Sequence, residues 1–229
     1  MNPDPAAVAD PMFVLLAWAG GIALATATVT IWRIVGPGFT WLGAASGALI
    51  GFWPVLGGNW TVAVAAAVLL VGGFLVKTNR TLSGVLQVVS AGLFVTAAAG
   101  LGGPVLAVTA TLAPGGITGE MLLGHWFLVD PTMPRRVLRT LALGGIVGTV
   151  IDALMVVVTV GSPGGDFAAA IYWGLAATTV VLMLAVLGAL RHPAYSGVMA
   201  ATGLSYLAVL TGLAAVFVGR ILATGSGPF

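Results

Sequence analysis

Three ionisable side chains, those of Glu120, His125 and Asp152, stand inside strongly apolar stretches of the sequence. A carboxyl group in such surroundings must be paired with a cation, hydrated or protonated, because a bare charge is costly away from water. Buried carboxyls of this kind either bind and release protons or tie helices together through hydrogen bonds. We therefore take Glu120 and Asp152 as candidate proton-transfer residues.

The composition indicates which kind of structure must hold these residues. Hydrophobic residues make up 59% of the chain and charged residues 6%, and no soluble core could bury so much apolar surface. We expect an all-α polytopic membrane protein whose main partner is the lipid bilayer. A helix needs about 20 apolar residues to cross a bilayer. Eight stretches of about this length are bounded by Gly, Pro, Asn or charged residues: 12–33, 39–57, 60–77, 81–101, 104–129, 137–160, 167–190 and 194–220.

The second half of the sequence repeats the first. Residues 31–37 match residues 125–131 at an offset of 94 residues. Three further matches follow in the same order: Leu42-Gly43-x-x-x-Gly47 with Leu143-Gly144-x-x-x-Gly148, Trp60 with Trp173, and Ser83-Gly84-Val85 with Ser196-Gly197-Val198. We expect two parallel four-helix repeats, 12–101 and 104–220, between an N-terminal segment, 1–11, and a C-terminal tail, 221–229.

The two repeats differ in their ionisable groups. Glu120, His125 and Asp152 have uncharged counterparts in the first repeat, namely Thr26, Ile31 and Gly51. Chemistry is therefore expected in the second repeat alone.

Charge asymmetry predicts the orientation. Seven of the eight basic residues fall on one side of the expected helices: Arg33, Lys77, Arg80, Arg135, Arg136, Arg139 and Arg191. Basic loops face the cytoplasm, so both termini are expected outside, with Arg220 on that side. The positive-inside rule explains the Arg135-Arg136-Arg139 group, which also suits anionic lipid headgroups or a cytoplasmic subunit.

Helix packing can be predicted from the small residues. The stretches 39–57 and 137–160 carry glycines four residues apart, which lets backbones approach closely. We expect these two helices to pack against each other.

The expected helices also set the depths of the two carboxyls. Glu120 lies ten residues before Asp130, which places it about 15 Å into the membrane, near the midplane. Asp152 falls in the outer leaflet, about 7 Å from the level of Glu120. Pro114-Gly115-Gly116 lies one turn from Glu120 and predicts a kink, a loop end or a broken helix there.

Four further residues are candidates for binding a small molecule in the second repeat. His125 and Trp126 would form a polar and aromatic wall toward the cytoplasm. Thr149 lies one turn before Asp152, and Tyr206 shares a helix face with Thr202 at i, i+4 spacing. All of these residues also serve as ordinary polar contacts between membrane helices.

Several kinds of chemistry lack their motifs. The sequence has no phosphate-binding Gly-rich loop with Lys, no HExxH or GxSxG motif, and no basic run suited to nucleic acid. Haem ligation by His125 and His192 is not favoured, because His192 lies in a loop beside Pro193. No metal site is expected, since Glu120, His125 and Asp152 differ in depth and face. The cofactor stays open, with a quinone as the candidate.

Three functions remain. Buried charges confined to one repeat favour an integral membrane subunit of a redox complex in a prokaryotic plasma membrane, with a quinone-like molecule and a proton path in the second repeat. Two four-helix bundles resemble in topology the NrfD-like quinone-binding subunits, although no motif matches residue by residue. Such a chain carries no evident redox centre of its own, so it would depend on partner membrane or redox subunits. The second function is a proton- or cation-coupled transporter of a small solute that uses Glu120 and Asp152. The third is a structural or assembly subunit.

Overall fold

The computed structural model describes residues 10–160 and 167–223. The expected N-terminal segment up to residue 9, Asp166, and the tail from residue 224 lie outside the described residues.

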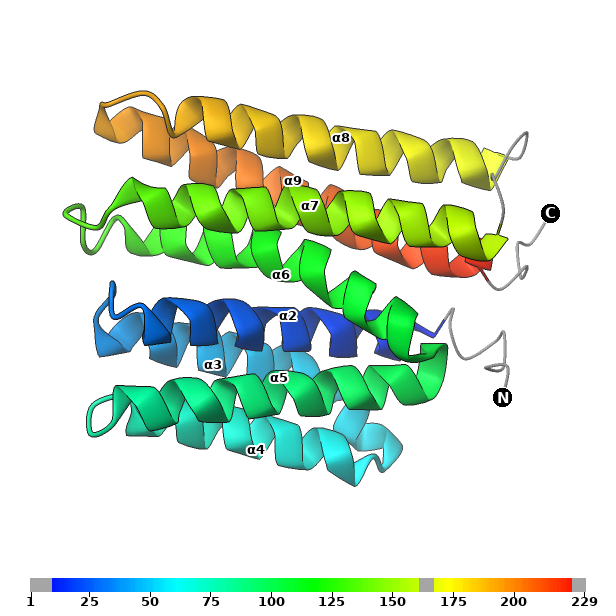
Figure 1. Cartoon of the computed structure of the whole chain (residues 1–229), viewed down its shortest axis with the longest axis horizontal. Helices are drawn as coiled ribbons and strands as arrows, with labels where there is room; N and C mark the ends of the chain where they lie inside the picture. Colours follow the sequence, from blue (N-terminus) through cyan, green and yellow to red (C-terminus); the bar gives the residue numbers. More distant parts are fainter. Residues whose placement is uncertain (1–9, 161–166, 224–229) are drawn as a thin grey trace.

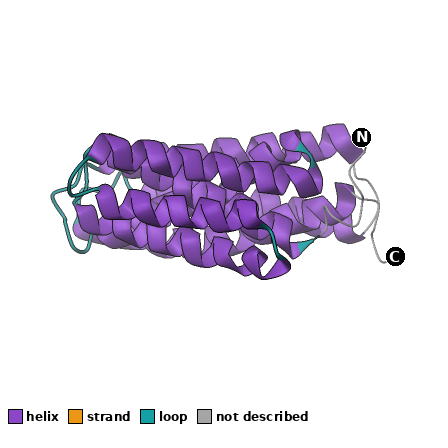
Figure 2. Cartoon of the chain, turned by 90° about the horizontal axis from the view of Figure 1, so that it is seen from below, coloured by secondary structure: helices purple, strands orange, loops and turns teal. Residues whose placement is uncertain are grey.

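All regular structure within these ranges is helical (Figure 2). The elements are α2 (Pro11–Ile31), α3 (Pro37–Phe52), the 3-10 helix η1 (Trp53–Gly57), α4 (Trp60–Leu75), α5 (Arg80–Gly102), α6 (Pro104–Trp126), α7 (Arg135–Val160), α8 (Phe167–Ala189) and α9 (Tyr195–Ala223). Six of the described helices, α2 and α5 to α9, are long and apolar enough to cross a membrane. The chain is a multi-pass membrane protein, as its composition predicts.

Two helices of the first half are shorter than the sequence predicts. α3 and α4 have 16 residues each, which corresponds to about 24 Å of helix. The stretch expected to continue α3 to residue 57 winds instead into η1, where Pro54 lacks the N–H that an α-helix needs.

Local capping signals place most helix starts. The side chains of Asp10, Asn59 and Asn79 accept hydrogen bonds from backbone N–H groups of the first turns of α2, α4 and α5, at 2.9, 3.1 and 3.0 Å. α3 and α6 each begin with a proline, which is favoured at the first helical position. Gly103, with a φ of 82°, is the one residue between α5 and α6.

The helices form two groups that lie side by side (Figure 1). Helices α2 to α5 pack with one another, and so do α6 to α9. We call these groups the first and second bundle. α2 and α6 form most of the contact between them.

α2 and α6 cross at a point where two backbones touch. A Cβ atom added to Gly21 would lie 2.6 Å from the Cα of Gly115, so neither position has room for a side chain. On one side of the crossing, Ala25 and Val29 of α2 join the core of the second bundle. On the other side, Ala107 and Ala110 of α6 join the core of the first bundle. The core of each bundle therefore includes residues from one half of a helix that belongs to the other bundle.

The expectation that the glycine-rich stretches 39–57 and 137–160 pack on each other is wrong. Gly43, Gly47 and Gly51 of α3 face side chains of their own bundle, and Gly43, for example, lies against Thr26 of α2. Gly148 of α7 lies against the backbone of Ala113 in α6. The small residues serve contacts within each bundle, because antiparallel helices that follow closely in the chain pack first against their neighbours.

Pro114-Gly115-Gly116 does not break α6, whose backbone is helical from Pro104 to Trp126. α6 bends near its middle (Figure 1), as expected where proline removes a backbone hydrogen bond. Gly115 faces α2, whereas Gly116 faces the backbone of Gly144 and Gly145 in α7. The motif lets α6 touch both neighbouring helices.

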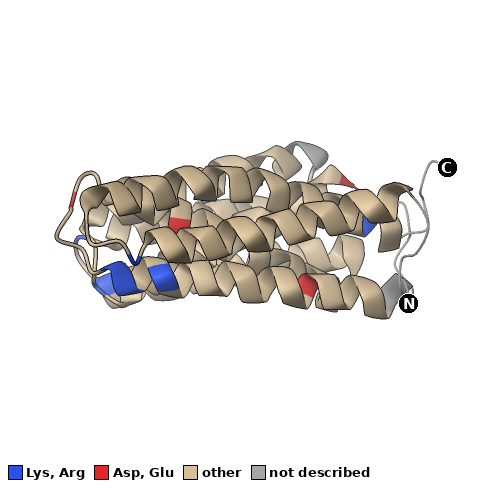
Figure 3. Cartoon of the chain, turned by 90° about the horizontal axis from the view of Figure 1, so that it is seen from above, with Lys and Arg blue, Asp and Glu red and all other residues tan. Residues whose placement is uncertain are grey.

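Seven of the eight basic residues gather at one end of the molecule, and Arg220 near the end of α9 lies toward the other (Figure 3). The end with the seven residues holds the turns that follow α2, α4, α6 and α8, and it carries Arg33, Lys77, Arg80, Arg135, Arg136, Arg139 and Arg191. We call it the arginine-bearing end. α2 begins and α9 finishes at the opposite end (Figure 1).

Candidate functional site

The carboxyl group of Glu120 is enclosed between α6 and α9. Glu120 has no exposed surface, and its carboxyl accepts a hydrogen bond from the hydroxyl of Ser205 on α9. Its other oxygen, Oε1, has no hydrogen-bond partner among the described residues. The ion pair that the described part of the chain contains does not involve Glu120. A buried carboxyl without a counter-charge is far less costly when it holds a proton than when it is ionised.

The surroundings of Ser205 accommodate a proton on Glu120. Ser205 Oγ is within hydrogen-bonding distance of the Glu120 carboxyl and lies 3.0 Å from the backbone carbonyl oxygen of Ala201. A hydroxyl has one proton to donate, so it cannot serve both acceptors. When Glu120 is protonated, it donates to Ser205 and Ser205 donates to Ala201, so that both bonds form.

Glu120 and Asp152 are further apart than the sequence predicts. Residues 127–130 form turns and not helix, so Glu120 is six residues, about 9 Å, from the end of α6. Asp152 lies level with Thr109, eleven residues before Glu120 and thus about 16 Å away along α6. The separation is larger than the expected 7 Å, because residues 127–129 form turns and α7 begins two residues earlier than expected. The depth of Glu120 in a membrane stays a prediction. The two carboxyls belong to separate sites.

Asp152 is paired with Arg220. The guanidinium of Arg220 on α9 donates to the carboxylate of Asp152 on α7, and Thr109 donates to the same oxygen at 2.9 Å. Arg220 is fully buried, and its guanidinium carbon lies 5.6 Å from the centre of the Phe13 ring. Its Nε and Nη1 have no hydrogen-bond partner among the described residues. The charge on Asp152 is therefore compensated, whereas that of an ionised Glu120 would not be.

A small cavity lies beside Asp152 in the second bundle. Its volume is about 10 Å³, enough for about one water molecule. Thr149, one turn from Asp152, and the buried Tyr172 both line this cavity. The Thr149 hydroxyl donates to the carbonyl of Gly145 at 2.8 Å, which leaves its lone pairs free to accept a bond.

A larger apolar groove opens between α7 and α8. It has a volume of about 460 Å³, and apart from Thr149 and Trp173 it is lined by Ala, Val and Leu side chains. Thr149 and Ala176 line both this groove and the small cavity at Asp152. Trp173 contributes an aromatic side chain to this groove, whose wall is almost entirely apolar.

The structure does not bring the other sequence-predicted site residues to Glu120. His125 is exposed, as is Tyr206 with 48% of its surface accessible. Trp126 faces the first bundle, where its ring meets Phe39 edge to face at 6.2 Å and covers Gly38. Of the four proposed ligand-binding residues, Thr149 is the one that borders a groove in the second bundle.

Both histidines lie toward the arginine-bearing end of the molecule. His125 and His192 are both exposed, and the backbone carbonyl of His192 accepts a hydrogen bond from Arg135. Within residues 10–160 and 167–223, no group of three His, Asp or Glu side chains is arranged to hold a metal ion.

The first bundle contains a buried polar network that the sequence analysis missed. Gln87 has no exposed surface and donates to Ser83 at 3.1 Å. Thr30 lies 3.3 Å from the Gln87 side-chain oxygen and 2.9 Å from Thr40. These groups are neutral, so a search restricted to ionisable residues could not find them. The signal was an amide side chain within an apolar stretch.

Comparison of the chain with protein-family models, with curated proteins and with solved structures gives no match. The functional argument therefore depends on the geometry of Glu120, of Asp152 and of the groove.

Proposed function

We propose that this chain is a membrane subunit that binds and releases a proton at Glu120 and holds a quinone-like molecule in the second bundle. The observation that carries the proposal is the state of Glu120, which is fully buried, hydrogen-bonded by Ser205 and without a compensating cation among the described residues. The charge of such a group changes only when it binds a proton or a cation. A neutral polar side chain would link the two helices at a lower desolvation cost.

The proposal includes eight membrane spans in two parallel four-helix repeats. Gly21 and Gly115, where α2 and α6 touch, are separated by 94 residues, the offset of the first matched sequence block. This coincidence is expected when the two copies meet on a pseudo-twofold axis along the membrane normal. α3 crosses together with η1, and α4 crosses as a short span.

The orientation in the proposal follows from the arginine-bearing end, which faces the cytoplasm of a prokaryotic cell under the positive-inside rule. Glu120 then lies about 9 Å from the cytoplasmic end of α6 and exchanges its proton with that side. Asp152 lies toward the outside. Thr179 and Thr211, which hydrogen-bond at 2.8 Å, lie between the two levels and serve as a polar step in the path.

The groove between α7 and α8 supports the quinone-like ligand. Its volume of about 460 Å³ suits an aromatic ring with a short apolar tail. The Trp173 side chain would pack against the quinone ring, and the rest of the lining would cover the apolar body. Reduction of a quinone takes up two electrons and two protons, so partner redox subunits would deliver the electrons.

Infrared difference spectroscopy of the protein in lipid nanodiscs tests the proton site. We expect a carboxylic-acid C=O band that changes with pH, that is absent in Glu120→Gln, and that persists in Asp152→Asn. The two substitutions are matched, since each replaces a buried carboxyl by its amide. A band that does not titrate, or that survives in Glu120→Gln, would refute proton binding at Glu120.

Quenching of tryptophan fluorescence by a short-chain benzoquinone tests the groove. We expect saturable quenching that loses its saturable part in Trp173→Phe and weakens in Ala177→Leu, which fills the groove. Ala170→Leu, an exposed position of the same helix outside the groove, is the control and should behave as the unmodified protein. Equal quenching in all four proteins would show that the quinone only partitions into the lipid.

A further inference from the structure

The three arginines at the start of α7 differ in their contacts. Arg135 donates to the backbone carbonyl groups of His192, Pro193 and Ala194 in the turn after α8, the last two at 2.7 and 3.2 Å. Arg139 donates to the carbonyl of Leu190 at 3.0 Å. These two residues fasten the turn between α8 and α9. Arg136 makes no such bond among the described residues.

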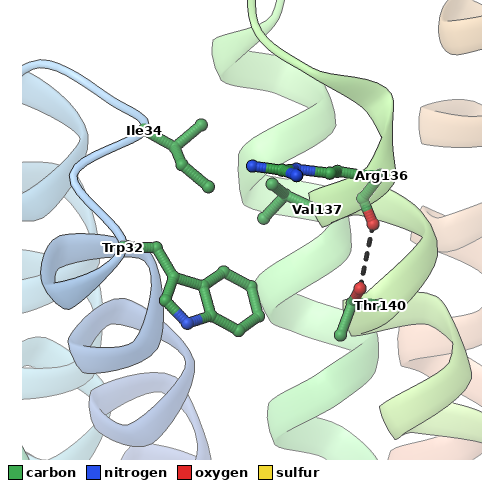
Figure 4. Close-up of a pocket in the computed structure, with 5 residues that line it drawn as sticks. All are labelled: Trp32, Ile34, Arg136, Val137 and Thr140. Atoms are coloured by element: carbon green, nitrogen blue, oxygen red, sulfur yellow. Dashed lines mark hydrogen bonds between the residues drawn. The ribbon is translucent and has the colours of Figure 1, made fainter.

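Arg136 instead lines a pocket at the seam between the two bundles (Figure 4). The pocket has a volume of about 310 Å³ and is lined by Trp32, Ile34, Arg136, Val137 and Thr140. Trp32 and Ile34 come from the end of α2, and the other three residues come from α7. Arg33, between Trp32 and Ile34, has a φ of 56°, and this left-handed turn brings the chain back so that Ile34 joins the pocket wall.

The polar groups of this pocket are suited to a phosphate. The Arg136 guanidinium is a fork of donors that matches phosphate oxygens. The Trp32 ring forms the opposite wall, with its indole nitrogen turned away from Arg136 (Figure 4). The pocket also lies at the N-terminal turn of α7, whose dipole favours an anion.

An apolar groove continues from this pocket toward the middle of the molecule. Thr140 lines both the pocket and the groove, which has a volume of about 150 Å³. The groove runs between α2, α6 and α7, past Leu24 and Leu141, to the glycines of the α2–α6 crossing. A charged pocket at the membrane surface that leads into an apolar groove within the bilayer has the polarity of a phospholipid.

We propose that an anionic phospholipid binds at this seam, with its phosphate on Arg136 and one acyl chain in the groove between α2 and α7. A headgroup with net negative charge is favoured over a zwitterionic one, because the pocket presents a guanidinium without an acidic side chain beside it. The lipid would fill the seam between the bundles near the arginine-bearing end. This site is separate from Glu120 and from the α7–α8 groove.

Native mass spectrometry and thermal stability in detergent, with phosphatidylglycerol or phosphatidylcholine added, test this proposal. We expect phosphatidylglycerol to be retained and to raise the melting temperature more than phosphatidylcholine does. Arg136→Gln should weaken phosphatidylglycerol binding by about 10-fold, which corresponds to one lost charge-assisted contact. Arg191→Gln is the matched control, since it removes an equal charge at the same end from a residue outside the pocket.

A second variant tests the groove without touching the charge. A Cβ added at Gly144, which lines the groove, would meet no heavy atom within 4 Å, so Gly144→Leu should fold and occupy the path of the acyl chain. We expect it to reduce lipid retention while leaving the binding of glycerol phosphate, added as a free headgroup, unchanged. Equal losses in Arg136→Gln and Arg191→Gln, or full retention in Gly144→Leu, would overturn the proposal. Binding of free glycerol phosphate as tight as that of the lipid would also overturn it.

Discussion

Arg220 neutralises Asp152 across the interface of α9 and α7, although the two residues are 68 positions apart in the sequence. Both side chains are buried, and Thr109 completes the bonding of the carboxylate. Their charges are therefore a matched pair within an apolar interior.

Removal of one member of this pair should be costly. We expect Asp152→Asn or Arg220→Met each to lower the free energy of unfolding by about 3 to 5 kcal/mol, because the remaining group is left buried and poorly compensated. The double variant Asp152→Asn, Arg220→Met should be more stable than the Asp152→Asn variant. Equilibrium unfolding in mixed micelles measures all three. Additive losses in the double variant would show that the two residues are not coupled.

Ser205→Ala should destabilise the protein more than an ordinary buried serine would predict. The substitution leaves the Glu120 carboxyl without a hydrogen-bond partner among the described residues, at a cost of about 1 to 3 kcal/mol. Ser90→Ala is the control, because Ser90 is equally buried and bonds only to the backbone carbonyl of Ala65. The same unfolding experiment measures both variants. Equal losses would mean that the hydrogen bond from Ser205 to Glu120 contributes no more to stability than the Ser90 bond does.

Gly21→Ala should disturb the contact between the bundles. The new methyl group would lie 2.6 Å from both the Cα of Gly115 and the carbonyl oxygen of Thr111, so α2 and α6 must separate. We expect a loss of about 1 to 3 kcal/mol, as for overpacked cores. Gly92→Ala in α5 has open space around its Cβ and should stabilise its helix by about 0.5 to 1 kcal/mol. Melting temperatures that shift in the same direction for both variants would contradict the crossing geometry.

The neutral network of the first bundle predicts non-additive effects. Gln87→Leu leaves Thr30 with fewer partners, and Thr30→Val leaves the Gln87 oxygen unbonded. We expect each substitution to cost about 1 to 2 kcal/mol, and the double variant to cost less than the sum, because the Gln87 oxygen that Thr30→Val leaves unbonded is then absent. A double-mutant cycle of unfolding free energies measures the coupling, and a coupling near zero would mean that the 3.3 Å contact contributes nothing.

Much of the helical plan could be predicted from the sequence. Gly, Pro, Asn and charged residues bound nearly all of the apolar stretches, and Asn59 and Asn79 cap helices that begin one residue later. Such signals are local, since each depends on residues within one helical turn. The depth of Glu120 could not be fixed in this way, because the apolar residues 127–129 form turns although their composition suits a helix.

The candidate site could be predicted only in part. Glu120 and Asp152 stand out as charges in apolar stretches, and both are buried. The pairing of Asp152 was missed because Arg220 lies close to the expected end of its helix, where an exposed basic residue is ordinary. α9 continues to Ala223, which leaves Arg220 inside the helix with no exposed surface. Which residues meet across helices depends on the rotation and tilt of each helix, and these cannot be predicted from a single sequence.

The contact of Gly21 with Gly115 makes the residue allowed at each position depend on the other. A mutation that adds a side chain at either position presses on the backbone of the other helix, and a change at the second position cannot relieve it, since glycine is already the smallest residue. Relatives of this chain should therefore keep glycine at both positions or re-space α2 and α6 as a whole. Sequence variation near this crossing is therefore expected on the other faces of α2 and α6.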